Sequence, residues 1–197
     1  MANTNAPFGF RPIRRLDGAA WSGNLTQKKM QITAGACNRG DVVKQMSDGT
    51  VAVSAAAAGA ANVGVADGFR FVAAALGYPI WTNYWPGAGA VAGTLVDVFV
   101  IDDPNVVFEV MANAGPITLA QVGDNADLVV TASTTGFSKW SLLTPAVGAG
   151  SDVLPFKVVG LGNAGVFISD GYDTTAANNI VEVAWNVHAY KTVALNA

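Results

Sequence analysis

The sequence contains few charged residues and no long hydrophobic run. Only 13% of its 197 residues are charged, whereas about 25% are charged in an ordinary soluble domain. The most apolar stretch, residues 51–65, is mainly Ala and Gly and is soon followed by Asp67, so it lacks the roughly 20 strongly apolar residues of a membrane-spanning helix. Arg11, Arg14 and Arg15 occupy the region where a signal peptide needs an apolar core. We therefore expect a soluble protein without a membrane partner.

The shortage of charge also bears on the surface of the protein. A free monomer normally uses charged side chains for solubility, whereas this surface must consist largely of Ala, Gly, Thr, Ser and Asn. Buried contact with other subunits explains such a surface, and an abundant, compact secreted protein is the alternative.

Cysteine and histidine each occur once. A single Cys37 excludes an internal disulfide and a multi-cysteine zinc site, and we expect it to be a small packed residue in a protein made in a reducing cytoplasm. Cys37 and His188 could in principle form a nucleophile–base pair. Because no sequence signature surrounds either residue, we interpret His188 as a structural residue at the end of a strand.

Three further motifs suggest chemistry and are better explained as turns. Asp102, Asp103 and Glu109 could form a glycosidase pair or a cation site, but residues 102–105 read as an Asp/Asn turn. Residues 170–173 lack the alternating acids and final Glu of a calcium loop. Residues 160–165 have the glycines of a dinucleotide fingerprint, but a strand-like segment follows where that motif needs a helix. We therefore predict no enzyme, and no catalytic, cofactor or metal site.

The few charges are unevenly distributed along the chain. Residues 1–44 carry seven of the eleven Lys and Arg residues and two acids, a net charge of +5, whereas the rest of the chain has a net charge of −8. A basic segment on an acidic body predicts that the two face different partners. The basic residues are dispersed and the total charge is −3, so we expect no nucleic-acid partner.

Residues 1–25 predict an extended N-terminal arm, because frequent Pro and Gly prevent a regular helix. Its apolar anchors follow no period and must dock on the body or on a neighbouring molecule. We expect contact with a partner from these residues of the arm: Pro7, Phe8, Phe10, Arg11, Arg14, Arg15 and Trp21.

Residues 26–197 predict a β-rich body, as one domain or two sub-domains. Short apolar segments recur about every ten residues between Gly and Asp turns, as in a β-barrel or β-sandwich. Asp48-Gly49 predicts a hairpin, and residues 180–187 alternate most clearly. Residues 117–122 are expected to form a short helical turn. The predicted fold is all-β, a single barrel or sandwich-like body with little helix.

Residues 76–93 form the most aromatic loop. Tyr78, Trp81, Tyr84 and Trp85 are typical anchors of protein interfaces. They could equally cover the core of their own domain, or form a platform for a sugar.

Residues 1–12 read MANTNAPFGFRP. This segment resembles the start of a family of tailed-phage virion structural proteins, whose members begin with a short Ala/Asn segment followed by Ala-Pro-Phe-Gly-(Leu or Phe)-Arg-Pro. Residues 98–110, with Asp102-Asp103-Pro104, and residues 123–128, Gly-Asp-Asn-Ala-Asp-Leu, are similar to two further family segments. These matches lie in the first two thirds of the chain and do not extend to the final third.

This resemblance implies a capsid decoration (cement) protein, made in the bacterial host cytoplasm and bound to the exterior of the virion capsid. The implied partners are the major capsid protein and other copies of the chain, with a trimer suggested by the habit of the family. It implies no catalytic residues and no cofactor. A tail or head-fibre component and a carbohydrate-binding β-module using Trp81, Tyr84 and Trp85 are the alternatives. A major capsid protein is disfavoured, because it needs a longer chain and a long helix.

Overall fold

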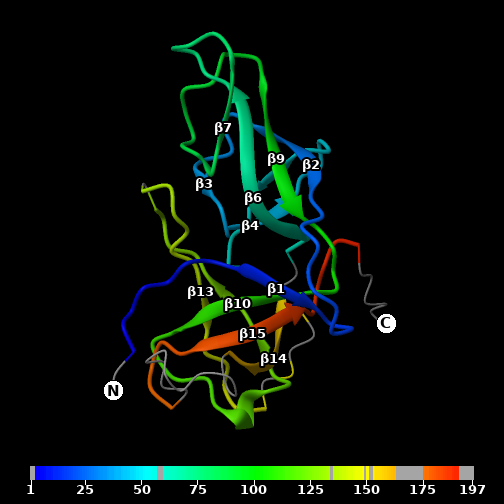
Figure 1. The fold of residues 1–197 in the computed structure, drawn as a ribbon, viewed down its shortest axis with the longest axis vertical. Helices are drawn as coiled ribbons and strands as arrows, with labels where there is room; N and C mark the ends of the chain where they lie inside the picture. Colours follow the sequence, from blue (N-terminus) through cyan, green and yellow to red (C-terminus); the bar gives the residue numbers. More distant parts are fainter. Residues whose placement is uncertain are drawn as a thin grey trace.

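The fold is all-β, as the sequence predicts (Figure 1). It was obtained as a computed structural model, which describes residues 3–56, 60–133, 135–148, 150, 153–162 and 175–190. The first sheet contains six strands: β2 (Thr26–Gln31), β4 (Val42–Gln45), β5 (Val51–Val53), β6 (Asn62–Val72), β7 (Pro79–Thr82) and β9 (Leu95–Ile101). The second contains seven: β1 (Arg11–Arg15), β10 (Val106–Asn113), β11 (Asn125–Ala126), β12 (Leu128–Val129), β13 (Ser141–Leu143), β14 (Phe156–Leu161) and β15 (Ile180–Trp185). A two-stranded sheet joins β3 (Cys37–Asn38) to β8 (Tyr84–Trp85).

Five strands of the first sheet close into a small barrel. The hydrogen-bonded order is β4-β5-β2-β9-β6, and β6 pairs again with β4. The Asp48-Gly49 hairpin is confirmed: Met46 donates its N–H to the Thr50 carbonyl at 2.9 Å, and Gly49 has a φ of 82°, which glycine adopts without steric cost. The interior is filled mainly by valines and by Phe69.

The second sheet is centred on β10. Val107 and Glu109 pair with β15 on one edge and with β1 on the other. The expected helical turn is present as a 3-10 helix, η1 (Leu119–Gln121), which Gly123 follows with a φ of 100°. In Figure 1 the barrel forms the upper part of the molecule and this sheet the lower part.

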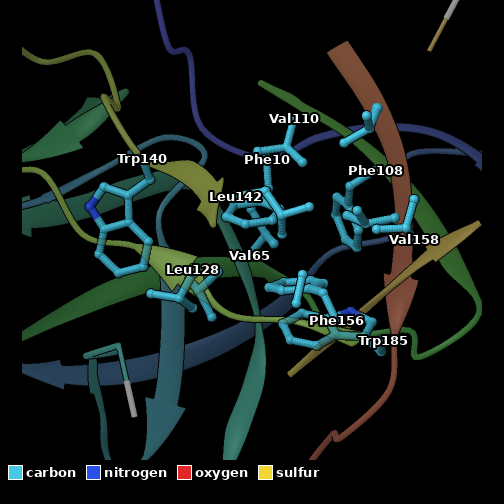
Figure 2. Close-up of a cluster of buried hydrophobic side chains, with 14 of the residues drawn as sticks. Phe10, Val65, Phe108, Val110, Leu128, Trp140, Leu142, Phe156, Val158 and Trp185 are labelled. Atoms are coloured by element: carbon cyan, nitrogen blue, oxygen red, sulfur yellow. The ribbon is translucent and has the colours of Figure 1, made fainter. Parts of the chain in front are cut away.

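The N-terminal arm is extended, but it is part of the second sheet. Strand β1 pairs antiparallel with β10, and Phe10, immediately before it, inserts its ring into the core. Figure 2 shows that ring at the centre of the lower cluster. Phe10 stacks on Phe156 with ring centroids 4.5 Å apart, and Phe156 stacks on Trp185 at the same distance. The arm therefore docks on the body of its own chain.

The turn at Asp102-Asp103-Pro104 joins the two sheets. Strands β9 and β10, which flank it, lie in different sheets and do not pair with each other. The aromatic loop also contains more regular structure than expected, since it includes β7 and β8. The strand expected at residues 166–168 lies outside the described residues.

Two hydrophobic clusters correspond to the two sheets. The largest side chains of the barrel cluster are those of Met30, Phe69, Phe71 and Trp85. The second cluster includes Val42, Val65 and Ile101 from barrel strands as well as the aromatic rings of the lower sheet. The two sheets are therefore packed together through side chains that the barrel directs downward.

Candidate functional site: an aromatic groove beside the N-terminal arm

A surface groove lies where the arm, the barrel and the loop between β12 and β13 meet. We call it the aromatic groove. Its main hollow has a volume of about 370 Å³, within the usual range of ligand pockets. One wall comes from the arm, through Pro7, Phe8, Arg11 and Pro12, and the other contains Phe137.

Close backbone approach holds the arm against this site. Gly9 has a φ of 78°, and a Cβ there would lie 2.5 Å from the Ser138 hydroxyl oxygen and 2.7 Å from the Gly40 carbonyl oxygen. Phe10 donates its N–H to the same Gly40 carbonyl at 2.9 Å. Only glycine fits at position 9, because any side chain would collide with Ser138 and with backbone.

The loop between β12 and β13 brings Phe137 to the groove. Phe137 forms a parallel bridge with Arg39 of the barrel side, and Gly136 lies so close to the Tyr84 ring that a Cβ would be 2.8 Å from it. The Phe137 residue is nevertheless 74% exposed. The backbone of this loop is thus held in place while its phenyl ring faces solvent.

A second hollow, about 290 Å³ in volume, continues the groove across the outside of the barrel. It shares Asp67 and Asn83 with the main hollow. Trp81 stacks on Phe99 with ring centroids 4.9 Å apart, and Phe99 is paired with Gly68, which has no side chain. Trp81 remains 67% exposed, so the groove has an exposed aromatic residue in each of its two hollows.

The charges of the groove come from two arginines and one aspartate. Asp67 lies at a register shift between β6 and β9, where a bulge re-aims a side chain, and its carboxylate accepts a hydrogen bond of 2.7 Å from Arg39. The Arg11 guanidinium lies 4.5 Å from the centroid of the Phe8 ring and 3.7 Å from Glu109. The side chains of Arg11 and Arg39 are 59% and 56% exposed.

The other arginines of the arm bind acids of their own chain. Arg14 pairs with Glu182 at 2.6 Å, and Arg15 pairs with Asp103. These ion pairs explain the uneven charge along the sequence, because opposite charges that are far apart in the sequence neutralise each other in the fold. That the arm and the body face different partners stays a prediction. Of the three arm arginines predicted for partner contact, Arg11 alone keeps a mostly exposed side chain.

Three of the predicted aromatic anchors belong to the cores. Phe10 and Trp85 are buried, in the lower and the barrel cluster respectively, and Trp21 is partly buried against the lower cluster. The expectation that Phe10 anchors a partner is therefore wrong for this fold, since its ring has no free surface. Tyr78 and Tyr84 are exposed, but neither lines the groove.

A buried carboxyl group lies beneath the junction of arm and barrel. Asp41 accepts hydrogen bonds from the backbone and the side-chain amide of Asn38, at 2.7 and 3.2 Å. Burial raises the pKa of Asp41 above its ordinary value, although hydrogen bonds from Ser138 and Asn38 act in the opposite direction. The charged form of Asp41 is therefore less favourable in this position than it is in water.

The residues considered for catalysis have structural surroundings. Cys37 is fully buried in the barrel, and burial raises the pKa of its thiol well above the ordinary value, which leaves little thiolate. The His188 ring nitrogens contact the Val63 carbonyl at 2.8 Å and the Tyr190 N–H at 3.2 Å. In the described part of the chain, no three His, Cys, Asp or Glu side chains gather as a metal site.

The candidate carboxylates are each bound to another group. Asp102 accepts a hydrogen bond from the Thr26 hydroxyl at 2.8 Å. Asp103 accepts one from the Asn105 N–H at 2.9 Å, as expected of a turn. Residues 170–173, and residues 163–165 of the glycine motif, lie outside the described residues.

Sequence reasoning missed Phe137, Arg39 and Phe99. Phe137 follows Gly136 between polar residues, where an isolated apolar residue could have been noted as an exposed anchor; Arg39 and Phe99 reach the groove only through strand pairing.

Among the described residues, no helix is long and apolar enough to cross a membrane. Comparison with protein-family models, curated proteins and solved structures found no match.

Proposed function

We propose that this chain is a decoration (cement) protein that binds the exterior of a tailed-phage capsid and stabilises contacts between capsomers. One observation carries the proposal: the N-terminal segment that resembles phage virion proteins forms a wall of the aromatic groove. Phe137 and Trp81, the two most exposed aromatic residues in the described part of the chain, lie in the same groove. The major capsid protein is the proposed partner.

The groove has the properties of a protein contact. Aromatic and arginine side chains provide most of the binding energy in protein interfaces, and here Trp81 stacks on Phe99 and Arg11 stacks on Phe8 before any partner binds. Preorganised groups lose little conformational entropy when a partner docks. A capsid lattice also presents many equivalent sites, so each copy needs only modest affinity.

Co-sedimentation of the purified chain with capsids that lack it tests this function. We expect saturable binding with a fixed copy number and capsids that better resist heat. Phe137→Ala and Trp81→Ala should each weaken binding by about tenfold or more, the usual scale of a hot-spot loss. Leu119→Ala is the matched control, because Leu119 is 76% exposed but lies in η1, outside the groove.

The wild-type chain staying in the supernatant at all concentrations contradicts the proposal. Removal of residues 1–15 is a poor test, because it also removes β1 and the buried Phe10. Loss of binding by such a truncation would report loss of the fold as well as loss of the contact.

The oligomeric state is a separate part of the proposal. We propose a homo-oligomer, with a trimer suggested by the family resemblance, and sedimentation equilibrium of the free chain measures it. The alternative sugar platform is not assembled as expected, since Trp85 is buried. A tail or head-fibre role predicts binding to tail or fibre proteins in place of bare capsids in the same sedimentation assay.

A further inference from the structure

We propose that the aromatic groove binds an extended peptide segment that carries apolar side chains and at least one carboxylate. The inference rests on the proposed function for the source of this segment, which is then the major capsid protein. The chemistry of the segment is argued from the groove itself, and it can be tested without capsids.

The shape of the groove favours an extended chain. The two hollows share Asp67 and Asn83 as common lining and run from the arm to the outside of the barrel. The path passes from Phe8 and Phe137 at one end to Trp81 and Leu25 at the other. An extended segment can follow such a path and place its side chains in successive hollows.

The apolar side chains of the segment would be recognised by exposed aromatic rings. Phe137 offers a ring on a loop whose backbone is held by the Arg39 bridge and by the contact between Gly136 and Tyr84. Trp81 is held by its stack on Phe99. An aromatic ring held as the Trp81 ring is gives a large contact area at a small cost in entropy.

The carboxylate of the segment would be recognised by the two arginines. A guanidinium has five N–H donors, and Arg39 uses its Nε atom for Asp67. The 3.7 Å contact between Arg11 and Glu109 is longer than a normal hydrogen bond. Each of these two largely exposed guanidinium groups is near one carboxylate, Arg11 near Glu109 and Arg39 near Asp67. Recognition of an acidic partner therefore rests on the further N–H donors of the two arginines and not on a net charge of the groove.

The stack of Arg11 on Phe8 positions one of these groups at the edge of the groove. Stacked guanidinium groups bind carboxylates with defined geometry, which a flexible lysine does not reproduce. A segment with Asp or Glu beside an aromatic, Leu or Pro residue meets both requirements.

A displayed library of random dodecapeptides tests the inference directly. The library is selected on the immobilised wild-type chain after depletion on the Phe137→Ala variant. We expect the enriched peptides to share an acidic residue next to apolar ones. A labelled enriched peptide should then bind in fluorescence polarisation, with affinity that falls as salt screens the charges.

Single variants separate the apolar and charged parts of the contact. Phe137→Ala should weaken the peptide by about tenfold, and Arg11→Gln by about fivefold because its ion pair is partly exposed. Lys157→Gln is the control, as Lys157 is an exposed cation outside the groove. Replacing the acidic residue of the peptide by its amide should cost as much as Arg11→Gln.

Three results overturn the inference: no enrichment beyond the Phe137→Ala depletion, enriched peptides without an acidic residue, or an Arg11→Gln variant that binds as well as the wild type. Self-association of the chain that Phe137→Ala abolishes also overturns it, because a second copy then fills the groove. Capsid binding that depends on Phe137, without any peptide binding, leaves the proposed function standing and removes only this inference. Peptide binding without capsid binding leaves this inference standing and contradicts the proposed function.

Discussion

The barrel and the seven-stranded sheet solve the problem of sheet edges in different ways. In the barrel, β4, β5, β2, β9 and β6 form a closed ring of paired strands, which leaves no free edge within that ring. In the lower sheet, β10 relies on the N-terminal strand β1 to cover one of its edges. The barrel is closed by strands that all come from residues 26–101, whereas the lower sheet needs β1, which precedes all of the barrel strands in the sequence.

The cores differ in the same manner. The barrel core consists mainly of valines that come from its own strands. The lower core is built around Phe108, Phe156 and Trp185 and is completed by Phe10 from the arm. Because a distant segment completes the lower core, the stability of that region depends more strongly on one side chain. This dependence can be tested, from the largest expected effect to the smallest.

Phe10→Ala and Phe69→Ala form a matched pair, since both rings are buried, one in each core. Each should lower the free energy of unfolding by about 3–5 kcal/mol, the cost of deleting a buried phenyl ring, measured by urea denaturation. Hydrogen exchange should separate them: Phe10→Ala should reduce protection in β10, β14 and β15 more than in β6 and β9, and Phe69→Ala the reverse. An equal loss of protection in all of these strands in both variants would show that the barrel and the lower sheet unfold as one cooperative unit, and would contradict the comparison.

Gly9→Ala should release the arm from its position. Gly9 and Gly18 have φ angles of 78° and 84°, but a Cβ at Gly9 would meet Ser138 and Gly40, whereas at Gly18 nothing lies within 4 Å. Gly18→Ala should therefore cost only about 1–2 kcal/mol for the left-handed backbone. Gly9→Ala should cost clearly more in the same denaturation assay, and equal losses would contradict the close packing of the arm.

The buried or half-buried carboxyl groups of Asp41 and Asp97 should make the free energy of unfolding depend on pH in opposite directions. The pKa of Asp41, at the junction, is raised, so its contribution is present at low pH and is lost as pH rises through its folded-state pKa. For Asp97, outside the barrel, burial would raise the pKa, but Lys29, Gln27 and Arg70 lower it overall. Its contribution is therefore present above the ordinary pKa of 3.8 and is lost as pH falls below that value.

Urea denaturation as a function of pH measures these two effects. Asp41→Asn should remove the part of the pH dependence that lies above pH 3.8, the ordinary value of the carboxyl group. Asp97→Asn should instead reduce the loss of stability at lower pH. An unchanged profile in Asp41→Asn would mean that the junction tolerates the charge without cost.

Local features of the fold could be predicted from the sequence because they depend on neighbouring residues. The Asp48-Gly49 hairpin, the alternating strand within residues 180–187 and the helical turn near residues 117–122 are all found at the positions that the local sequence predicts. Pairing between distant strands could not be predicted in this way. A period of two shows that a segment is a strand, but not that β9 and β10 enter different sheets.

The candidate site was predictable only in part for the same reason. Pro7, Phe8 and Arg11 were expected to contact a partner and Trp81 was one of the possible interface aromatics. All four line the groove, although the partner contact itself stays a prediction. Phe10 is buried against Phe156, and the two arginines Arg14 and Arg15 pair with Glu182 and Asp103. These contacts could not be predicted because the partners are far away in the sequence.

The position of the arm also has a consequence for the order of synthesis. Residues 3–15 leave the ribosome before the groups that hold them, because β10, Trp140 and Phe156 are made about one hundred or more residues later. The arm therefore cannot pair with these groups until they too have emerged. The barrel can close during this interval. The groove, whose wall is the arm, cannot form before these partners have been made, so a nascent chain acquires its proposed contact surface late in its synthesis.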